Sequence, residues 1–364
     1  MSRRFSLLLL IVLATLSLGF GPPRLTDSDL AIKRLTPQQI ALMRNDPVPE
    51  VTAAAVLLVN PTTGQVIYAQ NEHARRAPAS LTKLITALVA MERADLERRI
   101  HISENDLSVW TMIGLQENEI QPLRELLPVL LLPSDNAAAM AIARNVGGDV
   151  NVFVGWMNEW VENWGLQNTR FANPSGLDAE GNYTSAWDMA RIALYAMQDP
   201  MLRSILSQPE MVSTNRRLVN TNEMLRRYPG AVGVKTGTER QAGQCLITLV
   251  ERRQGQALSV LLGSTDRYAD ATALTDYFYR NYAELTIDLP PSPINQYVDE
   301  NGDLRPMGLV EPARFLARSW QMGDLTMVRR IENPTANPTP DEPIGRLEVY
   351  LAGRPLVELP LYAK

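Results

Sequence analysis

The pattern of apolar and polar residues predicts a hairpin followed by a buried helix in the first third of the chain. Apolar residues fill positions 55–59, and a turn signal at 60–64 separates them from a second strand-like stretch at 66–68. Between residues 81 and 91 the apolar positions recur at helical spacing with few polar interruptions. Lys83 is one of those interruptions, on a segment that otherwise has the pattern of a buried helix.

The middle of the chain is helical by the same criterion. A break with the sequence Pro-Ser-Asp-Asn separates two of the helices, and Thr184 or Ser185 is the expected N-cap of the last one. The expected helices cover residues 123–132, 137–148, 150–166 and 184–197.

Strand signals return late in the chain. Residues 244–250 and 257–265 are strand-like, and residues 270–284 have a helical pattern. Strands at both ends of a helical middle predict one α/β unit, from residue 49 to residue 285, whose sheet is assembled from both chain ends.

The last part of the chain has a different composition. From residue 287 onward prolines are frequent and no strong helix is present, but short strand candidates recur. Residues 288–364 are therefore predicted to form a small β-rich second domain, in which 332–345 is a loop. Residues 22–46 are ambiguous, with one short helix possible at 36–43.

The first 21 residues have the pattern of a targeting segment. Arg3 and Arg4 precede an apolar stretch at 5–20, which is typical of a secretory signal and short for a membrane-spanning helix. Residues 1–21 are predicted to be a cleaved signal peptide or an N-terminal anchor. The protein is therefore expected to be exported and extracytoplasmic, either free or tethered to the membrane. The chain has one cysteine, Cys245, in a strand-like segment, so no internal disulfide can form.

Charge and composition exclude several classes of function. The 364 residues carry a net charge of −5, which argues against nucleic-acid binding. Two histidines and one cysteine, far apart in the sequence, give no metal-ligand cluster. Neither a G-x-G-x-x-G pattern nor a P-loop is present, so no nucleotide cofactor is expected.

Ser80 and Lys83 form the first pair that indicates chemistry. A serine hydroxyl is a weak nucleophile and needs a base within hydrogen-bond reach. His73 and His101 lie in no triad context. Lys83 can serve instead, because residues three apart share a face of a helix. If Ser80 opens that helix, its backbone N–H also lies at the positive end of the helix dipole.

Protonation of Lys83 is the main obstacle to this chemistry. A free lysine has a pKa near 10.4, so about one in 2,500 is neutral at pH 7, a handicap of about 4.6 kcal/mol. Burial can lower a lysine pKa by about 3 to 5, and a nearby cation acts in the same direction. We expect the apolar helix to supply the burial and a second lysine to supply the cation.

Two further motifs strengthen the indication that Ser80 and Lys83 act in catalysis. Ser134-Asp135-Asn136 lies at the break between two helices, and Lys235-Thr236-Gly237 lies in a strand-like segment. Separately, the first is also a common N-cap cluster and the second a common strand end. S-x-x-K, S-D-N and K-T-G in this order are the signature of penicillin-recognising serine enzymes.

The chain resembles the serine D-alanyl-D-alanine carboxypeptidases, the low-molecular-mass penicillin-binding proteins. The resemblance rests on "PASLTKLITAL", "LLLPSDNAAAMAIA", "FANPSGLDAEGNYTSAWDMARIA", "NTNEML" and "GVKTGTERQAGQCLI". It implies an α/β (α+β) fold of the serine β-lactamase and transpeptidase type, with an antiparallel sheet flanked by helices, a helical subdomain and the β-rich C-terminal domain. It also implies that peptidoglycan stem peptides ending in D-Ala-D-Ala are the substrates and that β-lactams are covalent inhibitors.

The resemblance also implies a role for each motif residue. Ser80 is the expected nucleophile and Lys83 its base, while Ser134 relays protons and Asn136 holds the substrate amide. Lys235, Thr236, Gly237 and Thr238 are the expected substrate-binding residues, of which Lys235 and Thr236 bind the terminal carboxylate. The backbone N–H groups of Ser80 and Thr238 are the expected oxyanion hole.

Two alternatives remain at this point. A class A β-lactamase needs a glutamate that activates the deacylating water. Glu159 and Asn163 match the E-x-x-x-N spacing of that glutamate, but they continue a periodic helix. We therefore expect Glu159 to be a solvated helix residue. The other alternative is a non-catalytic peptidoglycan-binding protein, against which the intact pair of Ser80 and Lys83 argues. Relatives commonly end in an amphipathic membrane helix, which the stretch "VELPLYAK" does not resemble, so membrane association is expected only through residues 5–20.

Overall fold

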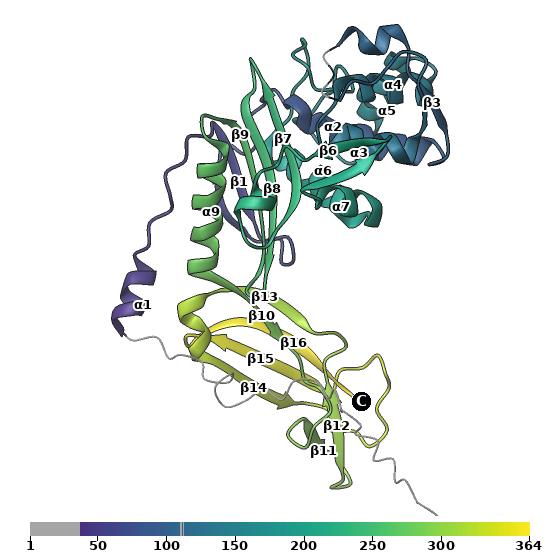
Figure 1. The fold of residues 1–364 in the computed structure, drawn as a ribbon. Helices are drawn as coiled ribbons and strands as arrows, with labels where there is room; N and C mark the ends of the chain where they lie inside the picture. Colours follow the sequence, from purple (N-terminus) through teal and green to yellow (C-terminus); the bar gives the residue numbers. More distant parts are fainter. Residues whose placement is uncertain (1–36, 110, 112) are drawn as a thin grey trace, which may run out of the picture.

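A five-stranded antiparallel sheet organises the larger part of the molecule (Figure 1). The computed structural model describes residues 37–109, 111 and 113–364, so the predicted targeting segment lies outside the described residues. The strand order is β2-β1-β9-β8-β7. The strands are β1 (Ala55–Val59), β2 (Val66–Gln70), β7 (Ala231–Glu239), β8 (Gly243–Arg252) and β9 (Gly255–Ser264). The predicted hairpin and the sheet built from both chain ends are both present.

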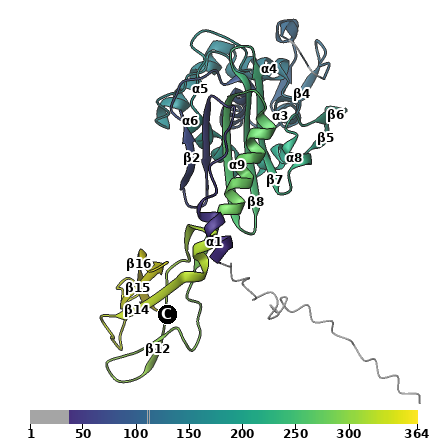
Figure 2. The same cartoon turned by 90° about the vertical axis from the view of Figure 1, so that its left-hand side faces the viewer.

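The two faces of this sheet are covered by different helices. Along β1, Ala55 and Leu57 pack into the core beneath the helical lobe, whereas Val56 and Leu58 pack against α9 (Arg267–Asn281). This alternation follows from the two-residue period of a strand. Figures 1 and 2 show α9 on one face of the sheet and the remaining large helices on the other.

The helical lobe contains the predicted helices with small shifts of their ends. Ser185 is the N-cap of α6, since its side chain accepts a hydrogen bond from the backbone N–H of Asp188. The lobe comprises η1 (Ala79–Thr82), α2 (Lys83–Arg93), η2 (Glu104–Ser108), α3 (Leu123–Leu131), α4 (Asn136–Gly147), α5 (Val150–Asn163), α6 (Ala186–Gln198) and α7 (Pro200–Leu206). Two short hairpins border it: β3 (Arg99–His101) with β4 (Ile120–Pro122), and β5 (Glu210–Ser213) with β6 (Arg216–Val219). The one-turn helix α8 (Met224–Arg227) leads into β7.

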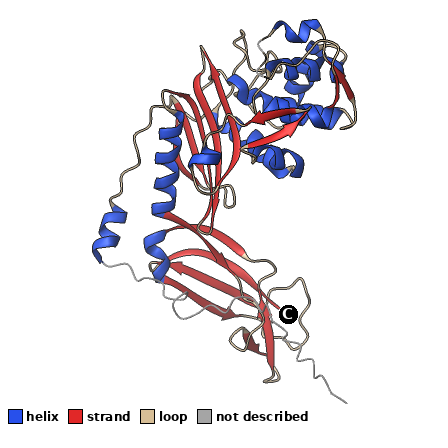
Figure 3. Ribbon diagram, viewed as in Figure 1, coloured by secondary structure: helices blue, strands red, loops and turns tan. Residues whose placement is uncertain are grey.

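The C-terminal part is rich in strands, as Figure 3 shows. The predicted helix at 270–284 ends earlier than expected, because Tyr282 begins β10 (Tyr282–Ile287), which pairs with β13 (Ala313–Arg318). The predicted division between 285 and 288 falls next to the end of this strand. A five-stranded sheet of order β11-β12-β16-β15-β14 follows. Its strands are β11 (Gln296–Val298), β12 (Leu304–Gly308), β14 (Leu325–Ile331), β15 (Gly345–Leu351) and β16 (Arg354–Ala363), and η3 (Ser319–Asp324) precedes β14.

The first described helix, α1 (Pro37–Arg44), lies beside the junction of the two parts (Figure 2). The Arg44 guanidinium lies 4.4 Å from the ring centroid of Trp320, and Asp46 accepts hydrogen bonds from Arg280 and Asn281. Among the described residues, no helix combines the length and apolar composition needed to cross a bilayer.

Candidate active site

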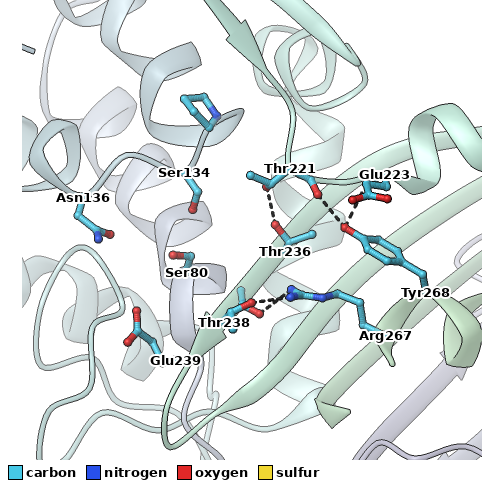
Figure 4. A pocket seen from close by; sticks show the side chains of 12 residues that line it. Ser80, Ser134, Asn136, Thr221, Glu223, Thr236, Thr238, Glu239, Arg267 and Tyr268 are labelled. Carbon is cyan, nitrogen blue, oxygen red and sulfur yellow. Dashed lines mark hydrogen bonds between the residues drawn. The ribbon is translucent and has the colours of Figure 1, made fainter. Parts of the chain in front are cut away.

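A pocket of about 360 Å³ opens between the end of β7 and the helical lobe (Figure 4). All three motifs found in the sequence contribute to it, although they lie far apart in the chain. Its lining residues are Ser80, Pro133, Ser134, Asn136, Thr221, Glu223, Thr236, Gly237, Thr238, Glu239, Arg267 and Tyr268. Lys83 and Lys235 lie directly behind this lining, both fully buried.

Ser80 is presented by a tight turn rather than by the helix itself. The expectation that Ser80 opens the α-helix is wrong, since α2 begins at Lys83 and Ser80 lies on the preceding 3₁₀ turn η1. Residues three apart eclipse one another in a 3₁₀ turn, so the two side chains still meet. Ala79, just before Ser80, is buried with φ +48°, a conformation that costs a non-glycine residue about 1–3 kcal/mol.

The loop that carries Ser175 packs against this turn and holds it in place. Gly176 has φ +86°, and a Cβ atom at this position would lie 1.9 Å from the carbonyl oxygen of Ala79. Only glycine therefore allows the loop to approach η1 so closely. Thr86 of α2 donates a hydrogen bond to the carbonyl oxygen of Pro174, which holds the loop against the helix.

Lys83 is arranged so that its lone pair can face Ser80. Its Nζ lies 2.8 Å from Ser80 Oγ, 2.7 Å from Asn136 Oδ1 and 2.6 Å from the Ser175 carbonyl oxygen. The last two atoms only accept hydrogen bonds. A neutral amine would donate its two hydrogens to them and keep its lone pair for the hydroxyl of Ser80.

Burial lowers the pKa of Lys83 to about 7, although the carboxylates of Asp135 and Glu239 act in the opposite direction. The second lysine of the pocket is Lys235, and its own pKa is lowered well below its usual value by burial, by Lys83 and by Arg267. Burial is the main cause that brings Lys83 into the range of a useful base.

The middle motif places Ser134 at the corner between α3 and α4. Ser134 has φ +65°, and its Oγ accepts a hydrogen bond of 2.8 Å from Lys235 Nζ. Asp135 is the N-cap of α4, where its carboxylate accepts hydrogen bonds from the Ala138 backbone N–H and the Thr111 hydroxyl. The aspartate therefore holds the start of the helix, from which Asn136 extends to Lys83.

Strand β7 presents alternate residues to two sides of the pocket. A Cβ atom on Gly237 would lie 2.9 Å from Ala79 Cβ and 3.1 Å from Ser80 N, so only glycine lets the strand pass this close to the nucleophile. On the other face, Thr236 Oγ1 lies 2.5 Å from Thr221 Oγ1, and Thr238 Oγ1 accepts a hydrogen bond from Arg267.

The sequence motifs do not include Arg267, Thr221 or Glu239. Arg267 is the first residue of α9, and its guanidinium donates to the carbonyl oxygens of Gly237 and Cys245. Within the described part of the chain it has no carboxylate in ion-pair range, so its positive charge at the rim of the pocket is not neutralised by an ion pair. Thr221 and Glu239 nevertheless lie in two stretches, "NTNEML" and "GVKTGTERQAGQCLI", on which the resemblance rests.

Glu159 and Cys245, whose residue types can serve in other reactions, lie outside the pocket. Glu159 is on α5, is 53% exposed and forms an ion pair with Arg93, in agreement with its prediction as a solvated helix residue. Cys245 is buried within β8, as predicted, and burial raises the pKa of its thiol to about 11. The described residues contain no group of three or more His, Cys, Asp or Glu placed to hold a metal ion.

Comparisons with known proteins agree with this geometry. A family model described as D-alanyl-D-alanine carboxypeptidase matches residues 42–266. The D-alanyl-D-alanine carboxypeptidase DacF of Bacillus subtilis (strain 168) is 30% identical over 86% of this chain and 85% of its own length. DacA of Escherichia coli (strain K12), which has the same enzyme name, is 31% identical over 69% of this chain and 64% of its own length.

Solved structures show the same architecture. Penicillin binding protein 5 from Haemophilus influenzae superposes with a TM-score of 0.70 at 24% identity, covering 86% of this chain and 97% of that structure. A mutant of the Streptomyces K15 DD-transpeptidase gives a TM-score of 0.60 at 29% identity, covering 63% of this chain and 98% of that structure. These structures confirm the fold class predicted from the sequence.

Proposed function

The chain belongs to the D-alanyl-D-alanine carboxypeptidase family, and from this premise we propose that Ser80 forms the acyl-enzyme with Lys83 as its base. The activity predicted from the motifs, that of a serine-type hydrolase acting on D-alanyl-D-alanine ends, is confirmed. The observation that carries the residue assignment is the 2.8 Å distance between a fully buried amine and the serine hydroxyl.

The first step is attack on the carbonyl carbon of the penultimate D-alanine. Lys83 Nζ takes the proton of Ser80 Oγ while the bond between that oxygen and the carbonyl carbon forms. At a pKa of about 7, about half of the Lys83 amines are neutral at pH 7. The handicap of about 4.6 kcal/mol in a free lysine is thereby almost removed.

The second step is expulsion of the terminal D-alanine. Its nitrogen needs a proton when the C–N bond breaks, and Ser134 is placed to deliver one. Because Lys235 Nζ donates to Ser134 Oγ, the hydroxyl hydrogen of Ser134 is free to point into the pocket. The proton taken by Lys83 replaces it, and water then releases the acyl group from Ser80.

Substrate binding is assigned to the exposed edge of β7 and the residues around it. β7 is the last strand of its sheet, so one edge is available to pair with an extended peptide. The N–H groups of Ser80 and Thr238 are proposed as the oxyanion hole, with a contribution of about 3 to 4 kcal/mol from each donor. Asn136 is proposed to hold the substrate amide, next to Gly237.

The terminal carboxylate is assigned to Arg267 and to the hydroxyls of Thr236 and Thr238. The sequence suggested Lys235 for this role, but its amine is fully buried and already donates to Ser134 and to the Thr236 carbonyl oxygen. Arg267 is the cation on the open side, and its guanidinium already contacts Thr238. Lys235 is instead assigned to positioning Ser134.

The wider assignments follow from the family. We propose that the substrates are peptidoglycan stem peptides and that the enzyme acts outside the cytoplasm. β-Lactams are proposed to acylate Ser80 and to form an acyl-enzyme that hydrolyses slowly. Residues 1–21 are proposed to direct export and to supply any membrane association. Residues 49–285 are proposed as the catalytic domain and 288–364 as a β-rich second domain. Nucleic acid is not expected to bind.

Mass spectrometry of the intact protein tests the assignment. Incubation with benzylpenicillin should add one penicilloyl group to the wild type and none to Ser80→Ala, and the wild type alone should release D-alanine from a D-Ala-D-Ala peptide. A protein that binds the peptide but neither releases D-alanine nor becomes labelled would be a non-catalytic binder. Rapid loss of the penicilloyl group would instead indicate a β-lactamase.

A further inference from the structure

At the end of β7, a carboxylate that has no hydrogen-bond or ion-pair partner among the described residues faces the catalytic pocket. Glu239 is the last residue of the strand and lines the same pocket as Ser80. Figure 4 shows its carboxylate on the side of the pocket where Ser80 and Asn136 lie. Within the described residues, its side chain makes no hydrogen bond and no ion pair, which is unusual for a half-buried acid.

The pleat of β7 places this carboxylate on the nucleophile's side of the strand. Lys235, Gly237 and Glu239 are two residues apart and share one face, and Gly237 lies against Ser80. Glu239 is about 7 Å beyond Gly237 along the strand. An extended lysine-like side chain spans a similar distance, so a substrate residue beside Gly237 can bring its terminal group to this carboxylate.

The surroundings of Glu239 are acidic rather than neutralising. Burial is the main cause of its raised pKa, the nearby Asp178 adds to it, and Lys83 acts in the opposite direction. One carboxylate oxygen of Asp178 is buried without a hydrogen-bond partner among the described residues, while the other accepts from the Gln241 backbone N–H. Neither acid has an arginine or lysine within ion-pair distance in the described part of the chain.

The pocket therefore has opposite charge at its two ends. Arg267 lies at the end assigned to the substrate carboxylate, and Glu239 lies at the end toward which the acyl part of the peptide must extend. A ligand that complements both ends carries a carboxylate on its leaving group and a cation on its acyl part. Opposite charges placed in this way align the substrate before reaction.

We propose that Glu239 is a specificity-determining residue that selects substrates with a free ammonium group on the side chain next to the D-alanyl-D-alanine end. A diamino acid residue with an unacylated side-chain amine has this chemistry. The inference rests on the proposed function, because it assumes that the acyl part of the peptide passes Gly237. It adds no step to the reaction and concerns only which acyl donors are favoured.

Two peptides that differ by one charge test this inference. Nα-acetyl-L-lysyl-D-alanyl-D-alanine keeps the side-chain ammonium, and the Nα,Nε-diacetyl peptide does not. The quantity to measure is the ratio of kcat/KM for the first peptide to that for the second. We expect a ratio of about ten in the wild type, which Glu239→Gln should reduce to about one and Glu239→Asp should partly retain.

Glu180→Gln is the matched control, since Glu180 is an exposed acid on the same loop as Asp178. Its ratio should equal that of the wild type. A wild-type ratio of one, or a ratio that Glu239→Gln leaves at ten, would overturn the role of Glu239. Failure of the proposed function looks different, because neither peptide would then be cleaved and penicillin would not label Ser80.

Discussion

Acylation of Ser80 is expected to follow the titration of a single buried amine. The reactive form of the enzyme is the one with neutral Lys83, and its pKa of about 7 lies far below the usual 10.5 because the side chain is fully buried. For this pKa the neutral fraction is about 1% at pH 5, about half at pH 7 and about 97% at pH 8.5. The second-order rate constant of acylation should therefore fall about 50-fold between pH 7 and pH 5.

Stopped-flow measurement with a fluorescent penicillin across pH 5 to 9 would give this profile. The second-order constant reports the pKa of the free enzyme, provided that the penicillin has no group that titrates in this range. Circular dichroism at each pH would establish that the protein stays folded. Lys83→Gln is the matched control and should lose acylation at every pH. A rate that stays constant from pH 5 to pH 8, or that rises only above pH 10, would refute the assignment of a desolvated base.

Three further predictions concern the groups around the base. Arg267→Gln should raise KM for a D-Ala-D-Ala peptide about tenfold or more, because a charge-assisted contact to the carboxylate is lost, and it should affect an amidated peptide much less. Gly237→Ala should slow acylation about tenfold or more, since the added Cβ atom would lie 2.9 Å from Ala79 Cβ. Asp106→Asn should lower the free energy of unfolding by about 2–4 kcal/mol at pH 7, because the buried Asp106 carboxylate pairs with Arg144.

Each of these three predictions has an outcome that contradicts it. Equal KM changes for the free and amidated peptides would remove Arg267 from carboxylate binding. Acylation of Gly237→Ala at the wild-type rate would mean that β7 does not pack against Ser80 in solution. Burial acts to raise the pKa of Asp106, but hydrogen bonds from Arg144 and Ser103 lower it overall. The stabilisation that the Asp106 carboxylate gives is therefore present above pH 4 and lost as the pH falls further. If the free energy of unfolding of Asp106→Asn stayed below that of the wild type by the same amount down to pH 2, the pairing would be contradicted.

The sequence established the elements and the reacting groups. The continuous apolar stretch at 55–59 with its turn signal, and the helical period at 81–91, depend only on near neighbours, so the hairpin and α2 were predictable. Ser80 and Lys83 could be paired for the same reason, because three residues along a turn fix their separation. The order of the three motifs identified the family before any distance was known.

Only the tertiary structure decided which distant residues share the pocket and what charge each carries. The helix at 270–284 ends at Asn281 because Tyr282 pairs with β13, a partner that local periodicity does not reveal. Arg267 and Glu239 belong to the site because the strand order brings β7 beside Ser80 and places the start of α9 next to Thr238. The pKa values of the two lysines depend on burial, which results from packing among segments more than 50 residues apart. A sequence pattern records which groups are present, whereas desolvation and electrostatic repulsion depend on distances that only the folded chain defines.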